Sequence, residues 1–246
     1  MKHLLVAALL AVCAGCAAGS SAEEVDGEGA GAALSAAATP DPTFAQWAQI
    51  ATLAGAPVNR HGEATVVGVR GMGRDGTTHA TSAHHAFDDV VVVLKPDHTI
   101  VKISMSTHPF ETGGVAGVPD VDGDGVEDVG MIRPGVYRAV GRGNARLVGG
   151  HSAFDVTTAA GSGKLPGTRD TNHDGIFSDA EAAASDKRGD KVTSVLFHDA
   201  NDGAPPAVGC QVFDAPGIVA LIAAVGGPTS SFDYALVGSD DAAGVE

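Results

Sequence analysis

The sequence predicts a mainly β domain, a β-sandwich or β-barrel with one or two short helices. Eight runs rich in Val and Ile, bounded by Gly, Pro and Asp, have the composition and length of strands. Strands and helices do not alternate along the chain, and no strand leads through a Gly-rich loop into a helix, so a nucleotide-binding fold has no support. The 246 residues suit one ordinary domain with appendages.

The charge balance excludes whole classes of partner. Asp and Glu number 30 against 15 Lys and Arg, which gives a formal net charge of −15, and Lys and Arg form no run. Such a chain is repelled by DNA, RNA and anionic lipid surfaces. We therefore expect no nucleic-acid partner.

The first sixteen residues predict export. A short basic start precedes the apolar run Leu4 to Val12, which is too short for a membrane span and typical of a signal peptide. The run ends in Cys13-Ala14-Gly15-Cys16, which resembles the lipobox of bacterial lipoproteins although Cys13 replaces the usual aliphatic residue. The resemblance implies lipidation at Cys16, a location in the periplasm or cell envelope, and a lipid anchor as the only contact with the membrane. A plain signal peptide cut near Ala18 is the alternative.

A flexible tether and a short helix are expected next. Residues 17–42 consist mostly of Ala, Gly, Ser, Glu and Asp and cannot bury enough apolar surface to offset the entropy of ordering. Phe44, Trp47, Ile50 and Leu53 then recur every third residue, which predicts a helix over 43–54. Residues 43–63 form the lead-in to the main domain.

The main domain is expected over residues 64–238, followed by an acidic tail at 239–246. The predicted strands are 64–71, 89–95, 99–105, 135–141, 153–157, 191–198, 210–213 and 232–237. The three residues 96–98 are short enough to connect a hairpin. Residues 216–225 are the only other good helix candidate.

Residues 170–181 fit the twelve-position loop of an EF-hand. Oxygen ligands fall at positions 1, 3, 5 and 9, position 7 offers a backbone carbonyl, and position 12 is a glutamate able to bind a cation through both oxygens. Gly175 stands at position 6, where the loop turns sharply. The loop predicts a structural Ca²⁺ site. Because no entering helix precedes it, we expect the loop to lie between two strands. A solvated acidic turn is the alternative. The six ligand positions are Asp170, Asn172, Asp174, Ile176, Ser178 and Glu181.

Residues 120–131 repeat part of this pattern. Asp120, Asp122, Asp124 and Asp128 occupy positions 1, 3, 5 and 9, whereas position 12 is Met131. Without the closing carboxylate we expect weaker calcium binding, of the class of extracellular modules. An acidic β-turn fits this segment equally well.

One unmodified cysteine remains if Cys16 is lipidated. Cys210 follows Gly209 at the start of a predicted strand, and His198 ends the preceding one. An imidazole and a thiol at one edge of a sheet would allow the imidazole to take the thiol proton and leave a reactive thiolate. Burial of Cys210 in an apolar environment is the alternative.

These residues carry a family resemblance. Phe197-His198 and Val208-Gly209-Cys210-Gln211 resemble the catalytic segment of the L,D-transpeptidase (YkuD-like) family, and Arg133-Pro134-Gly135-Val136-Tyr137 is similar to that family's Pro-x-Gly-x-aromatic strand entry. The resemblance implies a β-sandwich in which His198 is the base and Cys210 the nucleophile. The thiol would form a thioester with a peptidoglycan stem peptide, and amides near Gly209 would form an oxyanion hole.

Departures from the family pattern leave the substrate open. Ala207-Val208 replace Ser-His before the Gly-Cys pair, and Gln211-Val212 replace an aliphatic residue and Arg after it. That Arg is a natural partner for a substrate carboxylate. Substrate-positioning roles are expected instead for Tyr137, Gln211 and Asp199. Either an amine or water would accept the acyl group, giving a cross-link or a peptidase, and a non-catalytic calcium-binding envelope module is the second hypothesis.

Other histidines fit weaker alternatives. His79, His84 and His85 lie in one polar loop and lack the i, i+4 spacing of a helical metal site. His151 with Asp155 is a candidate pair for orienting a ring, or a solvated pair.

Overall fold

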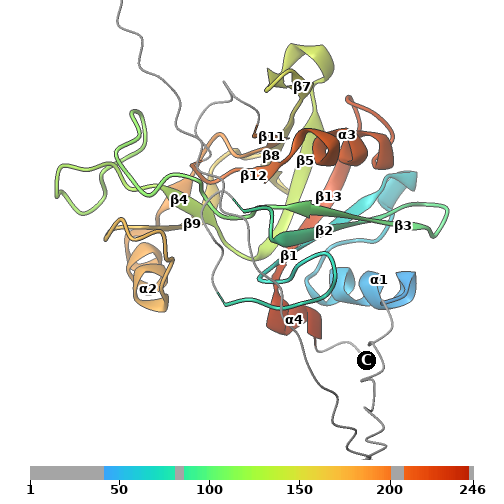
Figure 1. Cartoon of the computed structure of the whole chain (residues 1–246), viewed down its shortest axis with the longest axis horizontal. Helices are drawn as coiled ribbons and strands as arrows, with labels where there is room; N and C mark the ends of the chain where they lie inside the picture. Colours follow the sequence, from blue (N-terminus) through green and yellow to red (C-terminus); the bar gives the residue numbers. More distant parts are fainter. Residues whose placement is uncertain (1–41, 81–85, 201–207, 244–246) are drawn as a thin grey trace, which may run out of the picture. The chain divides into compact units, whose positions relative to one another are not determined.

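The computed structural model describes residues 42–80, 86–200 and 208–243. The predicted signal peptide, Cys16 and nearly all of the predicted tether lie outside these ranges. The described part confirms a mainly β fold, with one large sheet that nearly closes into a barrel (Figure 1). Its strand order is β12-β11-β8-β5-β13-β1-β2-β3. The strands are β1 (Thr65–Arg70), β2 (Asp89–Leu94), β3 (Ile100–Met105), β5 (Gly135–Gly141), β8 (Phe154–Thr158), β11 (Leu196–Asp199), β12 (Gln211–Phe213) and β13 (Ser231–Gly238).

One isolated bridge links the two edges of the large sheet. Just after β3, Ser106 N donates to Val212 O of β12 at 2.8 Å, and Val212 N donates to Ser106 O at 2.9 Å. Pairing the two edges removes exposed backbone groups that would otherwise recruit another strand.

Two helices cover opposite faces of the sheet. The capping box of Thr43 and Gln46 starts α1 (Phe44–Leu53), which buries Trp47 and Ile50 against β1 and β2. The helix α3 (Ala215–Ala224) begins at the Asp214 N-cap and packs against β3 and β11, adding Ile218 and Leu221 to the main core. Figure 1 shows α3 above the sheet and α1 below it. Because successive residues of a strand face opposite sides, β1 serves both cores.

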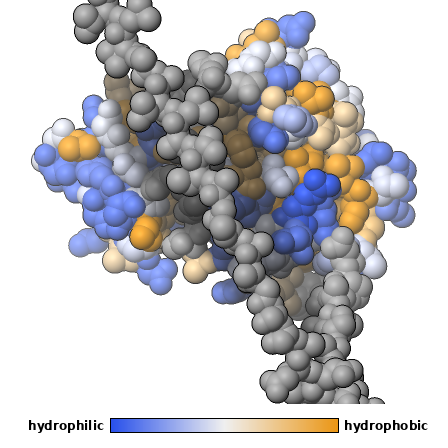
Figure 2. All heavy atoms as spheres, in the orientation of Figure 1, coloured by the Kyte–Doolittle hydropathy of each residue, from blue (hydrophilic) through white to orange (hydrophobic). Residues whose placement is uncertain are grey.

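A second, smaller lobe carries the acidic loops. A three-stranded sheet has the order β10-β9-β4, with β4 (Gly130–Ile132), β9 (Leu165–Arg169) and β10 (Lys191–Val192), and α2 (Asp179–Arg188) packs on β9. Figure 2 shows that the surface of this lobe, on the left of the view, is predominantly hydrophilic. The remaining elements are β6 (Leu147–Val148), β7 (His151–Ser152), the 3₁₀ turns Arg60–Gly62 and Gly143–Ala145, and α4 (Ser239–Ala243), which occupies much of the acidic tail.

Most predicted strands are confirmed, each to within one residue at either end. The run 191–198 is wrong as a single strand: it divides into β10 and β11, and Ser194 between them has a positive φ of 59°. The expectation of no further helix is also wrong. The missed helix α2 has little apolar periodicity, and it is fixed by a capping box of Ser178 and Glu181 and by Gly189 at its C-cap.

Candidate functional site

His198 lies in β11, and Cys210 immediately precedes the neighbouring strand β12 on the same face of the sheet. The strands β11 and β12 are parallel, with His198 beside Val212. Cys210 precedes Val212 by two residues, so the alternation of side chains places both on the face that His198 shares. Phe197, which precedes His198, and Phe213, which follows Val212, face the main core on the other side of the sheet.

The imidazole of His198 is held in one tautomer. Its Nδ1 lies 2.8 Å from the backbone oxygen of Asp199, and because a carbonyl only accepts, Nδ1 must carry the proton. The side chain is buried, and burial is the main cause that lowers the pKa of His198. A neutral ring with protonated Nδ1 leaves Nε2 as the nitrogen able to take a proton.

The thiol of Cys210 is buried and turned away from His198. It is 7 % exposed, packs with Val148, Ala153 and Leu196, and donates to the backbone oxygen of Ser194 at 3.8 Å. Ser194 precedes β11, whereas His198 lies toward the other end of that strand. Burial raises the pKa of Cys210 to about 11. At neutral pH this group is therefore a thiol, and the expected transfer of its proton to His198 has not taken place in this structure.

The expected substrate-positioning side chains do not lie beside Cys210. The hydroxyl of Tyr137 donates to Arg133 O at 2.6 Å inside the main core, and burial raises the pKa of this phenol to about 12. The amide oxygen of Gln211 accepts from Tyr234 at 2.6 Å on the same inner side. Both side chains point away from the face of Cys210, so the expectation that they position a substrate there is corrected.

Asp199 acts on two histidines through different atoms. Its backbone oxygen orients His198, and its buried carboxylate lies 2.6 Å from Nδ1 of His151 on β7. The expected pairing of His151 with Asp155 is therefore wrong; Asp155 pairs with Arg142 at 3.0 Å.

The loop 170–181 has a preformed frame that suits a cation. Asp170 Oδ2 accepts from Gly175 N at 2.8 Å, Asn172 Oδ1 from Asp174 N at 3.1 Å, and Asp174 Oδ1 from Ile176 N at 2.7 Å. Oδ1 of Asp170 is buried and has no hydrogen-bond partner within the described chain. Burial is the main cause that raises the pKa of Asp170, and the charges of Asp174 and Glu181 add to it. A divalent ion would relieve both the orphaned oxygen and this crowding.

The last ligand position belongs to a helix, because the loop runs from β9 into α2. Glu181 is therefore a capping residue of α2: its carboxylate accepts from Thr171 N at 2.9 Å and from Ser178 N at 2.9 Å. The expectation of a loop grafted between strands is corrected to a loop between a strand and a helix, which is the exit side of an EF-hand.

The loop at 120–131 repeats the same frame. Asp120 accepts from Gly125 N at 3.0 Å, and Asp122 and Asp124 each accept from the amide two residues ahead. Asp128 Oδ2 accepts from Val121 N at 2.6 Å, just as Glu181 accepts from the second residue of its loop. The carboxylates of Asp120, Asp122 and Asp124 have oxygens within 4.8 Å of one another. Asp128 therefore holds the place of the closing carboxylate that position 12 lacks.

The two loops lie side by side. The ladder of β4 and β9 pairs Gly130 with Arg169, so the first loop ends and the second begins at the same end of this ladder. His173 of the second loop contacts Asp128 at 3.2 Å and Asp124 at 3.8 Å. Their adjacency was not predicted, because it depends on a strand pairing between segments distant in sequence.

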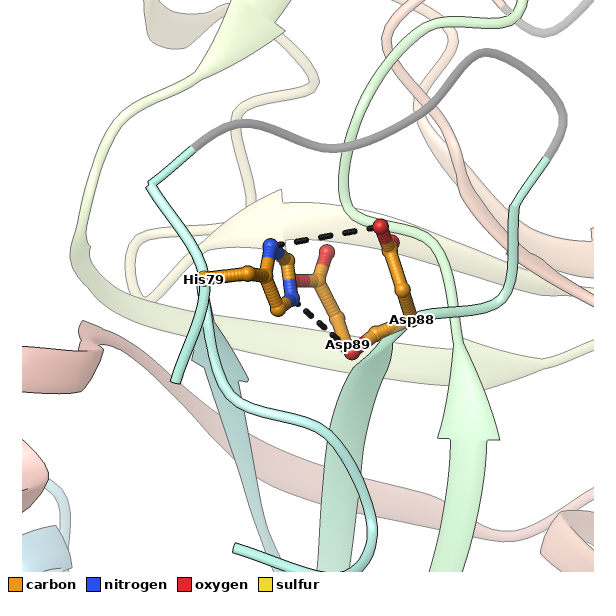
Figure 3. Close-up of side chains that lie close together, drawn as sticks. All are labelled: His79, Asp88 and Asp89. Carbon is orange, nitrogen blue, oxygen red and sulfur yellow. Dashed lines mark hydrogen bonds and ion pairs between the residues drawn. The ribbon is translucent and has the colours of Figure 1, made fainter. Parts of the chain in front are cut away.

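A second polar cluster lies at the ends of β1, β2 and β3. His79, Asp88 and Asp89 face one another (Figure 3), and His108 approaches Asp89 from β3. His79 and His108 line the cavity of about 760 Å³, which Cys210 and His198 do not line. Of the three histidines weighed in the sequence, only His79 lies within the described residues. The residues that join His79 were missed, because they lie at the ends of other strands, β2 and β3, and approach it only in the folded sheet.

Comparisons with protein-family models, with curated proteins and with solved structures found no match. Within the described ranges, no helix has the length and apolar character needed to cross a membrane.

Proposed function

We propose that this protein is an exported cell-envelope enzyme of the L,D-transpeptidase type, which transfers an acyl group from a peptidoglycan stem peptide through Cys210. The observation that carries the proposal is that His198 in β11 and Cys210, directly before β12, lie on one face of this strand pair, with Nδ1 of His198 fixed by Asp199 O. This arrangement supplies a neutral base beside the strand that directly follows Cys210, the only cysteine of the described residues.

The proposed chemistry follows from these two groups. Nε2 of His198 takes the proton of the Cys210 thiol as the sulfur attacks the carbonyl carbon of an amide. The carbon–nitrogen bond then breaks, and the imidazolium returns its proton to the leaving amine. A second amine resolves the thioester into a cross-link, whereas water resolves it into a free carboxylate.

The raised pKa of the thiol determines how the proton moves. A thiol with a pKa of about 11 is protonated at neutral pH, so sulfur attack requires a general base rather than a preformed ion pair. The thiol must also leave Ser194 O before it is deprotonated by His198. Substrate binding at the face shared by Val148 and Ala153 is the step proposed to turn it.

Calcium is part of the proposal as a structural ion. The residues that would hold it are Asp170, Asn172, Asp174, Ser178 and Glu181 through side chains and Ile176 through its carbonyl, with a weaker site formed by Asp120, Asp122, Asp124 and Asp128. Each bound ion would neutralise charge in a chain of net −15 and fix the small lobe.

The deciding experiment incubates the purified calcium-loaded domain with muropeptides and analyses the products by mass. We expect a new cross-linked or shortened muropeptide, lost in Cys210→Ala and reduced at least about a hundredfold in His198→Gln. The control is His98→Asn, an exposed histidine in the β2–β3 turn whose positive φ of 64° suits Asn. Unchanged muropeptides with the wild-type protein would refute the enzyme.

The buried thiol favours one second candidate, a non-catalytic calcium-binding module of the envelope. In that case Cys210 is a packing residue, and its exchange for Ala affects stability alone. The two candidates separate in the same experiment: the module leaves muropeptides intact but still shows calcium-dependent stability.

A further inference from the structure

We propose that His79, Asp88 and Asp89, assisted by His108, form a site for a divalent transition-metal ion of the zinc class. This site is separate from the thiol and does not depend on the proposed acyl transfer, whereas Gly175 and Ile176 of the acidic loop 170–181 line the same cavity as His79 and His108. Its ligands lie at or near the ends of three strands that are neighbours in the large sheet: His79 follows β1, Asp88 precedes β2, Asp89 begins β2, and His108 follows β3.

The spacing of the polar atoms suits an ion between them. One ligand atom each from His79, Asp88 and Asp89 lies within 4.8 Å of the others. Figure 3 shows the three side chains turned toward one another. Nδ1 of His79 is 3.9 Å from Asp88 Oδ2, and Nδ1 of His108 is 3.5 Å from Asp89 Oδ2. Both separations exceed an ordinary hydrogen bond, whereas ligands about 2.0–2.2 Å from a tetrahedral zinc ion are roughly 3.4 Å apart.

Another histidine–carboxylate pair of this protein makes a direct hydrogen bond. His151 and Asp199 approach to 2.6 Å, which leaves no room for an ion. That pair is a hydrogen bond between a histidine and a buried carboxylate, so burial and residue type alone do not produce the wider spacing at Asp89.

The surroundings hold the ligands in place. Oδ1 of Asp89 accepts from Gly71 N at 2.7 Å, and Oδ2 accepts from Thr107 N and Oγ1 at 2.8 and 2.7 Å. A carboxylate has about four acceptor positions, so these three bonds fix Asp89 and leave capacity for an ion. Nε2 of His79 lies 2.9 Å from Asp88 O, and such a hydrogen bond to a backbone oxygen is typical of metal-binding histidines. Nδ1 is then the nitrogen that would bind the ion, and it lies 3.9 Å from Asp88 Oδ2.

The donor set and the cavity decide the class of ion. Imidazole nitrogens with carboxylates and no thiolate suit Zn²⁺ and related ions, whereas Ca²⁺ takes oxygen ligands alone. His79 and His108 are 23 % and 20 % exposed, and both line the cavity of about 760 Å³. The cavity gives an ion a path of entry and leaves a position for water or a ligand, as in open zinc sites.

The test is a titration of the whole mature chain with Zn²⁺ by calorimetry, with Ca²⁺ present in excess so that the acidic loops are occupied. We expect one tight site per chain, weakened at least about tenfold in both His79→Ala and His108→Ala. The matched control His151→Ala removes the other histidine of a histidine–carboxylate pair and should bind Zn²⁺ as the wild type does.

A second measurement reports the ligands directly. Co²⁺ in place of Zn²⁺ should give visible absorption that His79→Ala abolishes while circular dichroism shows the variant folded. Zn²⁺ binding that is absent in the wild type, or unchanged in folded His79→Ala, overturns the proposal, because the ion is then not held by this cluster.

Discussion

Cys210 determines how the pH should affect both reactivity and stability. Burial raises its pKa from 9.0 to about 11, so the folded state favours the thiol. This contribution to stability is complete below about pH 8.5 and is lost as the pH rises through about 11. The shift corresponds to about 2–3 kcal/mol.

We therefore predict that the free energy of unfolding falls more steeply between pH 8.5 and 10.5 in the wild type than in Cys210→Ala. Urea titrations at several pH values measure the difference, since other groups titrate alike in both proteins. Alkylation of Cys210 in the folded protein should be slow at pH 7. Parallel pH profiles, or labelling at pH 7 as fast as that of a free thiol, would show that the thiol is not buried.

Gly209 is a position where a side chain is excluded. Its φ is 132°, and a Cβ atom there would contact Gly130 O and lie 2.8 Å from Val192. We predict that Gly209→Ala destabilises the fold by roughly 2–4 kcal/mol through strain and overpacking. Thermal unfolding measures it, with Gly163→Ala as the neutral control because nothing lies within 4 Å of that site. Equal midpoints for the two variants would contradict this role of Gly209.

Single residues differ in how far their roles could be predicted from the sequence. The ligand pattern of 170–181 was predictable because its members are neighbours in the chain. Cys210 and Gln211 were both expected at one site, yet adjacent strand residues face opposite sides, and the alternation alone would have excluded Gln211. The cluster of His79, Asp89 and His108 was not predictable, since it exists only once β1, β2 and β3 pair.

At the scale of elements, the strand–loop–helix unit of β9, residues 170–181 and α2 is the strongest calcium candidate. We predict that calcium at about 100 times its dissociation constant adds about 2.7 kcal/mol, which raises the unfolding midpoint by roughly 5–10 °C. Asp170→Asn should remove most of this gain, because it removes the negative charge of the carboxylate. Oδ1 of that carboxylate is buried and has no hydrogen-bond partner among the described residues.

Two further variants compare the calcium affinities of the two loops. Asp120→Asn should reduce the calcium-dependent shift less than Asp170→Asn, since the ligands Asp120, Asp122 and Asp124 are exposed. Asp97→Asn, in the β2–β3 turn, should leave the shift unchanged. A chelator that does not alter the wild-type midpoint would remove both loops from the proposal.

The sequence predicted those helices and strands whose buried side chains recur at regular intervals, and it missed those without such a pattern. The stripe of Trp47 and Ile50 predicted α1, and the Val-rich runs predicted most strands of the large sheet. The helix α2 depends on caps and on packing against β9. The strand β4 has only three residues, and β9 contains Pro166 and Gly167, which are uncommon in strands. Such elements carry a weak local signal.

At the scale of the whole molecule, the small lobe and the barrel share one core. Ile132 of β4, Leu165 of β9 and Val192 of β10 belong to the same buried cluster as Phe197 and Tyr234 of the large sheet. The strands β1, β2 and β13 carry this cluster on one face and the cluster around Trp47 on the other. A change at the calcium loops should therefore affect the stability of the whole described domain.

The single tryptophan makes this coupling measurable. Trp47 lies in α1, which packs against β1 and β2, and it is 2 % exposed. We predict one cooperative transition in which tryptophan fluorescence and far-ultraviolet circular dichroism coincide, and removal of calcium should lower both midpoints equally. If chelation instead produced an early circular-dichroism transition while the Trp47 midpoint stayed fixed, the lobe would unfold independently of the barrel. The shared cluster would then not couple the two.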